Sequence, residues 1–387
     1  MIENMKVLYL CPYGFSKKLG AEQQDILATI QLIKSIGTSS VHWLSLNLQS
    51  GVIFDHNKGE LITTKKLKFK HVPKFLKYKI FVIDRSMNKP FRLSSFIALK
   101  TFIDSNKIDL IITNTNSTVI YGLALKIKHI FRSLNYEPLH VLGEVENRLK
   151  AWILFLIKLF SVRFELNANI IWAISPRDLE LYNKRLGYSS KKIQLFPLTQ
   201  LSMSRSVEKK AVAMVSLNIG FLGASYNILH NRRSLTQLLE CFCDYSNNFH
   251  FSLNIYGQKV ELVKKKIQNN IFYNGWVENL SEIYEKNDIF VVPFVGGAGM
   301  QSKVFEPLTK GKILICDPLL LAGFDFSPNV HYLPAKNCQE IVFQLNWILN
   351  NREISSKISE NVLNQSFNIF NENEFKDTVI KSFTALT

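Results

Sequence analysis

The chain has 387 residues, of which 47% are hydrophobic and 20% are charged. This composition excludes a disordered or fibrous protein and is typical of a globular one, and the length suffices for two domains with ordinary cores. The formal net charge is +16, of which residues 1–200 carry +15 and residues 201–387 carry +1. We therefore expect any anionic partner to contact the N-terminal half.

The N-terminal half alternates short apolar runs with amphipathic stretches. This alternation predicts a parallel sheet with right-handed crossovers, whose ligands bind beyond the carboxyl ends of the strands. We expect strands at 7–11, 41–46, 110–113, 139–142 and 170–174, and helices between Gly20 and Gly37 and at 94–103, 119–130 and 176–187. Gly14, Gly20, Glu22 and the polar loop 114–118 then lie on the cleft side of the sheet.

Two segments of this half could contact an anionic surface. The first is a run of seven lysines with interleaved aromatic residues and no acid, from Lys65 to Lys79. It is either a solvated loop or a membrane-binding surface; nucleic acid would fit its charge, but no motif that reads nucleic acid accompanies it. The second segment, 149–164, is apolar, aromatic and flanked by cations, which is compatible with a core helix or an interfacial one.

The five cysteines, at 11, 241, 243, 316 and 338, show no paired framework. Cys241-x-Cys243 also lacks the further ligands of a metal site. We therefore expect buried thiols in a reducing compartment. No signal peptide pattern is visible, so the expected location is the cytoplasm.

The most informative stretch of the second half follows a predicted strand at 288–294. Glycines at 296, 297 and 299 come next, and then a helical pattern that Gly311 ends. A strand, a glycine-rich turn and a helix N-terminus form an anion site, because backbone N–H groups point at the ligand and glycine allows close approach. Lys303 and Glu306 lie one turn apart, so a phosphate and a sugar hydroxyl could be bound together; alternatively, they form an exposed ion pair.

Around this turn the sequence resembles a known family. Gly297-x-Gly299-x-x-x-Lys303-x-x-Glu306 is similar to the donor site of retaining glycosyltransferases of the GT-B fold, family 4 or "group 1". Three further motifs match in order, over roughly residues 215–345: Phe221-Leu222-Gly223 with Asn231, Asn254-Ile255-Tyr256-Gly257, and Asn274-Gly275-Trp276-Val277. The resemblance over residues 1–195 is weaker.

The resemblance implies an α/β protein of GT-B architecture, with two Rossmann-like domains that face a cleft. It implies an acceptor-side domain at 1–197, a linker at 198–213, a donor-binding domain at 214–370 and a helix at 371–387 that crosses back to the first domain. The donor would be bound by Gly20, Gly223, Asn231, Gly257, Trp276, Val277, Gly297, Gly299, Met300, Gln301, Ser302, Lys303 and Glu306. Lys303 would be catalytic, together with Glu144 and Glu146, which follow the strand predicted at 139–142 where relatives carry a His-Asp pair.

The implied activity is transfer of a sugar from a nucleotide-diphosphate donor to a glycan or lipid-linked glycan, with retention of configuration. We expect neither cofactor nor metal, since the chain has no Asp-x-Asp motif to hold a divalent ion. The expected setting is bacterial polysaccharide or lipopolysaccharide synthesis, on the inner face of an anionic plasma membrane and without nucleic acid. A nucleotide-sugar epimerase of the same architecture and a non-catalytic basic binding protein are the alternatives.

Overall fold

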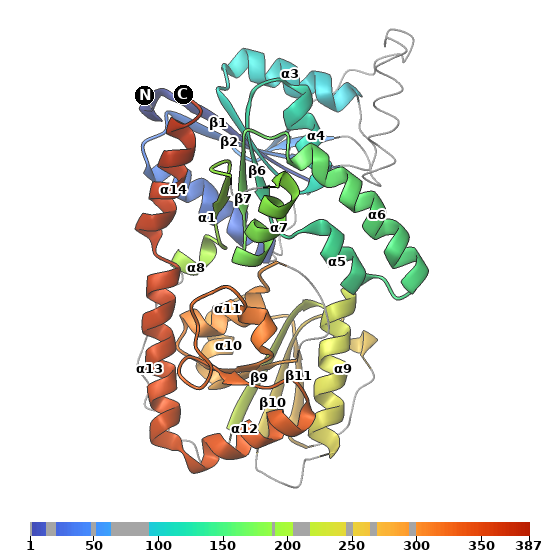
Figure 1. Cartoon of the computed structure of the whole chain (residues 1–387), viewed down its shortest axis with the longest axis vertical. Coiled ribbons are helices and arrows are strands. Elements are labelled where there is room, and N and C mark those ends of the chain that lie inside the picture. The colour runs from blue at the N-terminus through green and yellow to red at the C-terminus, as the bar shows by residue number, and fades with distance from the viewer. Residues whose placement is uncertain are drawn as a thin grey trace.

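The computed structural model describes residues 2–12, 21–47, 52–62, 93–187, 190–203, 217–244, 251–263, 269–293 and 299–387. Two α/β units lie one above the other in Figure 1, each built around its own sheet. The seven lysines of the run from 65 to 79, Gly20 and Gly297 lie outside the described residues.

The N-terminal sheet has the strand order β4-β3-β2-β1-β5-β6-β7-β8. The strands from β2 through β1 to β8 pair in parallel, and β3 and β4 add an antiparallel edge. The strands are β1 (Lys6–Cys11), β2 (Ser40–Leu46), β3 (Ile53–Asp55), β4 (Glu60–Ile62), β5 (Leu110–Asn114), β6 (Lys128–Ser133), β7 (Ile170–Ala173) and β8 (Ile193–Leu195). The helical elements are η1 (Ile2–Asn4), α1 (Ala21–Ser35), α3 (Leu93–Asn106), α4 (Asn116–Ala124), α5 (Glu137–Glu144), α6 (Arg148–Glu165), α7 (Pro176–Leu186) and α8 (Gln200–Met203).

The C-terminal sheet is parallel, with the order β11-β10-β9-β12-β13-β14. Its strands are β9 (Leu217–Ser225), β10 (Phe251–Gln258), β11 (Ile271–Gly275), β12 (Ile289–Val292), β13 (Ile313–Cys316) and β14 (Leu333–Pro334). The helical elements of this half are α9 (Leu229–Asp244), η3 (Val260–Leu262), α10 (Leu280–Lys286), α11 (Ser302–Thr309), η4 (Pro318–Leu321), α12 (Cys338–Asn350), α13 (Arg352–Ile369) and α14 (Glu372–Thr384).

The last two helices connect the two halves. α13 packs on α11 and β13, and α14 then returns to the N-terminal sheet, as Figure 1 shows, where it contacts α1. The buried indole of Trp172 on β7 donates to Ser382 Oγ on α14 at 2.9 Å. One cluster of buried apolar side chains therefore extends through α14 and α11 from one sheet to the other.

Local signals explain where α7 begins and ends. Ser175 caps the helix by accepting a hydrogen bond from the Asp178 N–H, Pro176 occupies its first turn, and Gly187 ends it in the left-handed conformation with φ 76°. These are the preferred residues for the three positions, since a cap needs a side-chain acceptor and a left-handed residue avoids a Cβ. The helix predicted at 176–187 is confirmed.

Two other predictions are wrong. The segment 139–142 is not a strand but lies within α5, which Pro138 opens in its first turn. The helix predicted at 119–130 ends at Ala124, and β6 begins at Lys128. Lys126 turns the chain between them with φ 53°. Pairing of β6 with β5 and β7 therefore overrides an apolar helical pattern that continues past the turn.

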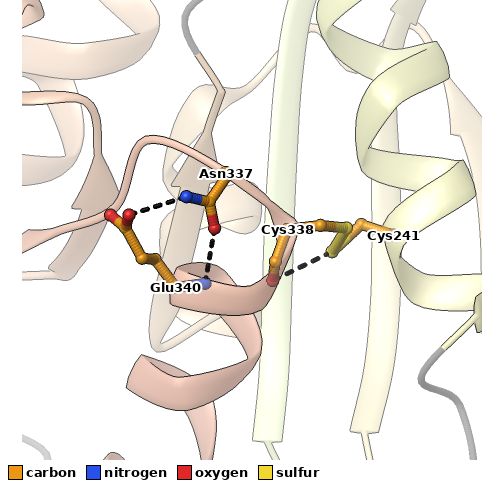
Figure 2. Close-up of a disulfide and its surroundings, with 4 residues drawn as sticks. All are labelled: Cys241, Asn337, Cys338 and Glu340. Atoms are coloured by element: carbon orange, nitrogen blue, oxygen red, sulfur yellow. Dashed lines mark hydrogen bonds between the residues drawn. A yellow bond between two sulfur atoms is a disulfide. The ribbon is translucent and has the colours of Figure 1, made fainter.

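The cysteine prediction also fails in part. Cys241 at the end of α9 and Cys338 at the start of α12 form a disulfide, although 97 residues separate them. Figure 2 shows this bond beside the N-terminus of α12, where Asn337 caps the helix by accepting from the Glu340 N–H. Cys11 and Cys316 are buried thiols, as expected. Among the described residues, no helix is long and apolar enough to span a bilayer.

Candidate active site

A cavity of about 430 Å³ lies between the two halves of the chain. Its upper wall, as Figure 1 is oriented, comes from the N-terminal half and its lower wall from the ends of β9 and β10 and from α9, α10 and α11. The N-terminal residues that line it include Glu22, Thr115, Asn135, Glu137 and His140. The C-terminal lining contains ten of the predicted donor residues: Gly223, Asn231, Gly257, Trp276, Val277, Met300, Gln301, Ser302, Lys303 and Glu306.

Lys303 lies in the first turn of α11 and is only 7% exposed. Its Nζ donates to Oδ1 of the buried Asn231 at 3.0 Å and lies 5.7 Å from the ring centroid of Phe221. Burial lowers the pKa of Lys303 to about 7, and the nearby Glu144 carboxylate opposes this shift. A buried lysine of this kind strongly favours an anionic ligand, because the negative charge raises the lysine pKa again and keeps its ammonium protonated.

Glu306 lies one turn further along α11 and is 6% exposed. Its Oε2 accepts from the Tyr284 hydroxyl at 2.8 Å, and its Oε1 accepts from Gln200 Nε2 at 2.8 Å. Burial raises the pKa of this carboxyl to about 7, and the bonds from Tyr284 and Gln200 act in the opposite direction. Because Lys303 and Glu306 are both buried with other partners, the alternative of an exposed ion pair is wrong.

The start of α11 adds backbone donors to the Lys303 cation. The first N–H groups of a helix have no partner within the helix, and the dipole makes this end positive. Ser302 opens α11 and also lines the cavity. An anion that reaches the cavity beside Lys303 therefore meets both a cation and helix N–H groups.

Two glycines allow close approach of backbone segments around the cavity. Gly299 has φ 73°, and a Cβ there would lie 2.5 Å from the carbonyl oxygen of Leu134 in the N-terminal half. Gly257 has φ 135°, and a Cβ there would lie 1.8 Å from the carbonyl oxygen of Gly223. Gly299 thus lets the turn before α11 touch the opposite half, and Gly257 lets the ends of β9 and β10 meet.

Glu144, the last residue of α5, and Glu146, just beyond it, face the C-terminal half without lining the cavity. Glu144 Oε1 forms a very short contact with His230 Nδ1, and Glu146 Oε1 lies 3.2 Å from Arg232 Nη2. Both partners belong to α9. The first pair is largely buried and the second is exposed, so these contacts join the halves at the cavity's edge. A catalytic role for Glu144 and Glu146 stays a prediction.

Sequence reasoning missed four side chains at this site: His140, Gln200, His230 and Tyr284. The sequence predicts a strand at His140, yet on α5 this residue lines the cavity, with its ring centroid 6.4 Å from that of His230. The sequence predicts a linker at Gln200, but this residue begins α8, which packs on α1 and α11. None of these residues belongs to a motif. The only usable signal was the amphipathic pattern that places Tyr284 on the buried side of α10.

A buried ion pair supports the N-terminal wall of the cavity. Asp25 on α1 and Arg132 on β6 are both fully buried, with Arg132 Nη2 2.7 Å from Asp25 Oδ2. Asp25 Oδ1 accepts from the Thr199 N–H at 2.6 Å, and Arg132 also donates to the Pro197 carbonyl at 3.1 Å. These bonds fix the residues that lead directly into Gln200, so they position the group that holds Glu306.

Comparison with known proteins gives the fold. Residues 216–342 match the family model described as "Glycosyl transferases group 1". The chain has the GT-B fold. Together, the family match and the GT-B fold support a glycosyltransferase. The comparison with curated proteins found no match.

Three solved structures illustrate the likeness over nearly the whole chain. Sucrose-phosphate synthase from Thermosynechococcus elongatus has a TM-score of 0.70 at 13% identity, with 99% of each chain covered. TarM has a TM-score of 0.65 at 8% identity, with 98% of this chain and 99% of that chain covered. HepE from Anabaena, in complex with UDP, has a TM-score of 0.62 at 11% identity, with 98% and 100% covered. The predicted GT-B architecture is confirmed, and these low identities carry the fold alone.

Proposed function

We propose that the protein transfers a sugar from a nucleotide-diphosphate donor to a glycan or lipid-linked glycan, with retention of configuration. The observation that carries this proposal is the placement of Lys303 and Glu306. Both are buried on one helix in the cavity between the halves, and each is held by a side chain from another element. The GT-B fold and the group 1 match support the same activity.

The diphosphate would lie against Lys303 and the start of α11. Negative charge grows on the diphosphate as the bond to the sugar breaks, and a preorganised cation and helix N–H groups stabilise it. Glu306 would accept hydrogen bonds from the ribose hydroxyls. Trp276 and Val277, which directly follow β11, line the cavity, and we propose that the base stacks there. HepE has been solved with UDP and with UDP-glucose, so UDP-sugars are the first donors to test.

We propose that this chemistry needs no divalent metal ion and no organic cofactor. The argument is that Lys303 and the α11 N-terminus supply the positive charge that a metal supplies in other transferases. Full activity in EDTA supports this idea. Loss of activity in EDTA, with recovery on addition of Mn²⁺ but not of salt alone, overturns it.

The acceptor is proposed to be a growing surface glycan, such as lipopolysaccharide or another bacterial polysaccharide, at the cytoplasmic face of the plasma membrane. The support is the resemblance to group 1 enzymes and the charge of +15 on residues 1–200. A cationic half would be drawn to anionic lipids that surround a lipid-linked acceptor.

A donor panel tests the proposal. The protein is incubated with UDP-, GDP-, ADP- and CMP-sugars, and release of the nucleotide is followed with and without acceptor glycans. Release of a nucleoside diphosphate that depends on Lys303 supports a transferase, and the anomeric signals of the product by NMR decide whether configuration is retained. Conversion of the donor to its epimer with no net transfer favours the epimerase. Salt-dependent RNA binding without turnover of any donor favours the basic binding protein.

A further inference from the structure

The outer side of α6 is apolar. Its large side chains there are strongly exposed: Leu149 by 72%, Trp152 by 58%, Ile153 by 51%, Leu156 by 58% and Phe160 by 43%. Successive helix residues are rotated by about 100°, so these five positions fall within a stripe roughly 100° wide along one face. We call these five residues the α6 apolar face.

The inner side of the same helix is the less apolar one. Its buried residues are Ala151, Ser161, Val162 and Glu165. By the same rotation they lie opposite the α6 apolar face. A surface helix of a globular domain normally shows the reverse pattern, with its large apolar residues toward the core. Contiguous exposed apolar residues of this kind mark a binding surface for a protein or a membrane.

The charges beside the α6 apolar face are positive. Arg148 and Lys150 are exposed on its two flanks, and the guanidinium of Arg163 lies 5.4 Å from the ring centroid of Phe160. The acid within the helix, Glu165, is buried and accepts from the Tyr182 hydroxyl. Apolar and aromatic residues with flanking cations suit an anionic lipid interface. A second copy of the chain would instead bring two sets of cations together, which costs free energy.

We propose that the α6 apolar face is a docking surface that inserts into the interface of an anionic phospholipid membrane. α6 packs along α5, and Lys158 on α6 lies 3.2 Å from Glu137 on α5. Glu137 and His140 of α5 line the cavity, so docking through α6 would bring the cavity wall next to the membrane surface. Membrane docking would give the cavity access to a lipid-linked acceptor, and this purpose rests on the proposed function. The membrane binding itself does not rest on it.

Vesicle binding tests the surface. The full chain is sedimented with vesicles of phosphatidylcholine and phosphatidylglycerol, and with phosphatidylcholine alone. The double variant Trp152→Ser/Leu156→Ser should bind the anionic vesicles about tenfold or more weakly, because two inserting side chains are lost. The matched control is Phe343→Ser/Ile354→Ser, which removes two side chains exposed by 64% and 46% from α12 and α13 of the other half. This control should bind like the wild type.

A second measurement reports insertion directly. Of the five tryptophans, Trp152 is strongly exposed and Trp172 is fully buried. The other three are half-buried and lie outside α6, at positions 43, 276 and 347, so lipid-dependent fluorescence changes should come mainly from Trp152. Brominated lipids should quench the wild-type emission. In Trp152→Phe, which keeps an apolar aromatic ring, binding should persist while most of the quenching disappears. Arg148→Gln/Lys150→Gln should weaken binding roughly fivefold per charge at low salt, and less at high salt.

The outcomes separate this inference from the proposed transferase. Donor hydrolysis in solution, without vesicles, should be the same in Trp152→Ser/Leu156→Ser as in the wild type. Equal vesicle binding by this variant and the wild type overturns the membrane surface and leaves the transferase standing. A concentration-dependent dimer that the variant disperses, with no vesicle binding by either protein, also overturns it and assigns the face to a second copy. Vesicle binding through α6 without turnover of any donor overturns the transferase alone.

Discussion

Replacement of Lys303 by methionine should stabilise the fold and impair the enzyme. Methionine keeps a flexible apolar stem of similar length, so the change removes the charge without leaving a large cavity. The side chain is 7% exposed, and burial lowers its pKa from 10.5 to about 7. Between pH 7 and about 10.5 the folded state therefore binds fewer protons at Lys303 than the unfolded state. The resulting free-energy penalty on folding is largest at and below pH 7 and declines as the pH rises.

The size of the folding penalty follows from the shift of the Lys303 pKa from 10.5 to about 7. One pKa unit corresponds to about 1.4 kcal/mol, so the shift to about 7 costs on the order of 4 kcal/mol at pH 7. The variant gains this amount but leaves Asn231 Oδ1 without its 3.0 Å donor, which costs about 1–3 kcal/mol. The net expectation is a stabilisation of roughly 1–3 kcal/mol at pH 6 to 7, or several °C in Tm. The gain shrinks as the pH rises to 10.5, where Lys303 is neutral in the folded state and only half-protonated in the unfolded state. The variant should be no more stable than the wild type at that pH.

Thermal melts from pH 6 to 10.5, combined with steady-state kinetics at pH 7, decide the matter. Loss of one preorganised electrostatic group should lower kcat about 10²–10³-fold, with a smaller effect on KM. Lys357→Met, which removes an exposed lysine from α13, is the matched control and should change neither quantity. A Lys303→Met protein that is less stable at every pH, or that keeps wild-type kcat, would refute the assignment of Lys303 as a strained, catalytic cation.

Three further expectations concern carboxylates. Glu306→Gln should raise the donor KM about ten- to a hundredfold, measured by steady-state kinetics. Because burial raises the pKa of Glu306 to about 7, the Tm of the wild type should fall as the pH rises from 4.5 to 7, and this fall should be absent from the variant. Asp25→Asn should destabilise the protein by about 3–5 kcal/mol in urea unfolding, since Arg132 would stay buried without its counter-charge. Glu144→Gln should shift the alkaline limb of kcat/KM to lower pH, because the Glu144 charge raises the pKa of Lys303. An unchanged limb would assign that titration to another group.

The C-terminal lining of the cavity was predictable because its determinants are local. The left-handed conformation of Gly299 and the start of α11 follow directly from residues within about one turn of Lys303. The carboxyl ends of parallel strands meet at one edge, so Gly223, Gly257 and Trp276 were expected at the same cleft, and the cavity contains all three. The α7 boundaries were equally local, set by Ser175 and Gly187.

The partners of these groups were not predictable, because they come from distant parts of the chain. Gln200 reaches Glu306 across 106 residues, and Arg132 reaches Asp25 across 107. No spacing rule links such positions. Tertiary packing brings them together, between the two halves for Gln200 and Glu306 and within the N-terminal half for Arg132 and Asp25. The Cys241–Cys338 disulfide is missed for the same reason.

The strand predicted at 139–142 illustrates a different limit. Its apolar run fits a buried strand as well as a short helix, and Pro138 was the sole local signal for α5. The sheet already receives β6 and β7 from the neighbouring segments, so tertiary pairing leaves this run outside it. That error also misplaced His140, which lines the cavity only because α5 is helical.

The hydrogen bonds that hold Glu306 and Lys303 leave both side chains able to bind a nucleotide sugar as well. A carboxylate offers about four acceptor positions, and among the described residues Glu306 uses one on each oxygen, for Gln200 and Tyr284. An ammonium has three donors, and one of those on Lys303 goes to Asn231. A ribose and a diphosphate could therefore bind both groups while Gln200 continues to link the halves. Donor binding would then add to the contacts between the halves without breaking them, and the negative charge of the diphosphate would keep Lys303 protonated although burial lowers its pKa to about 7.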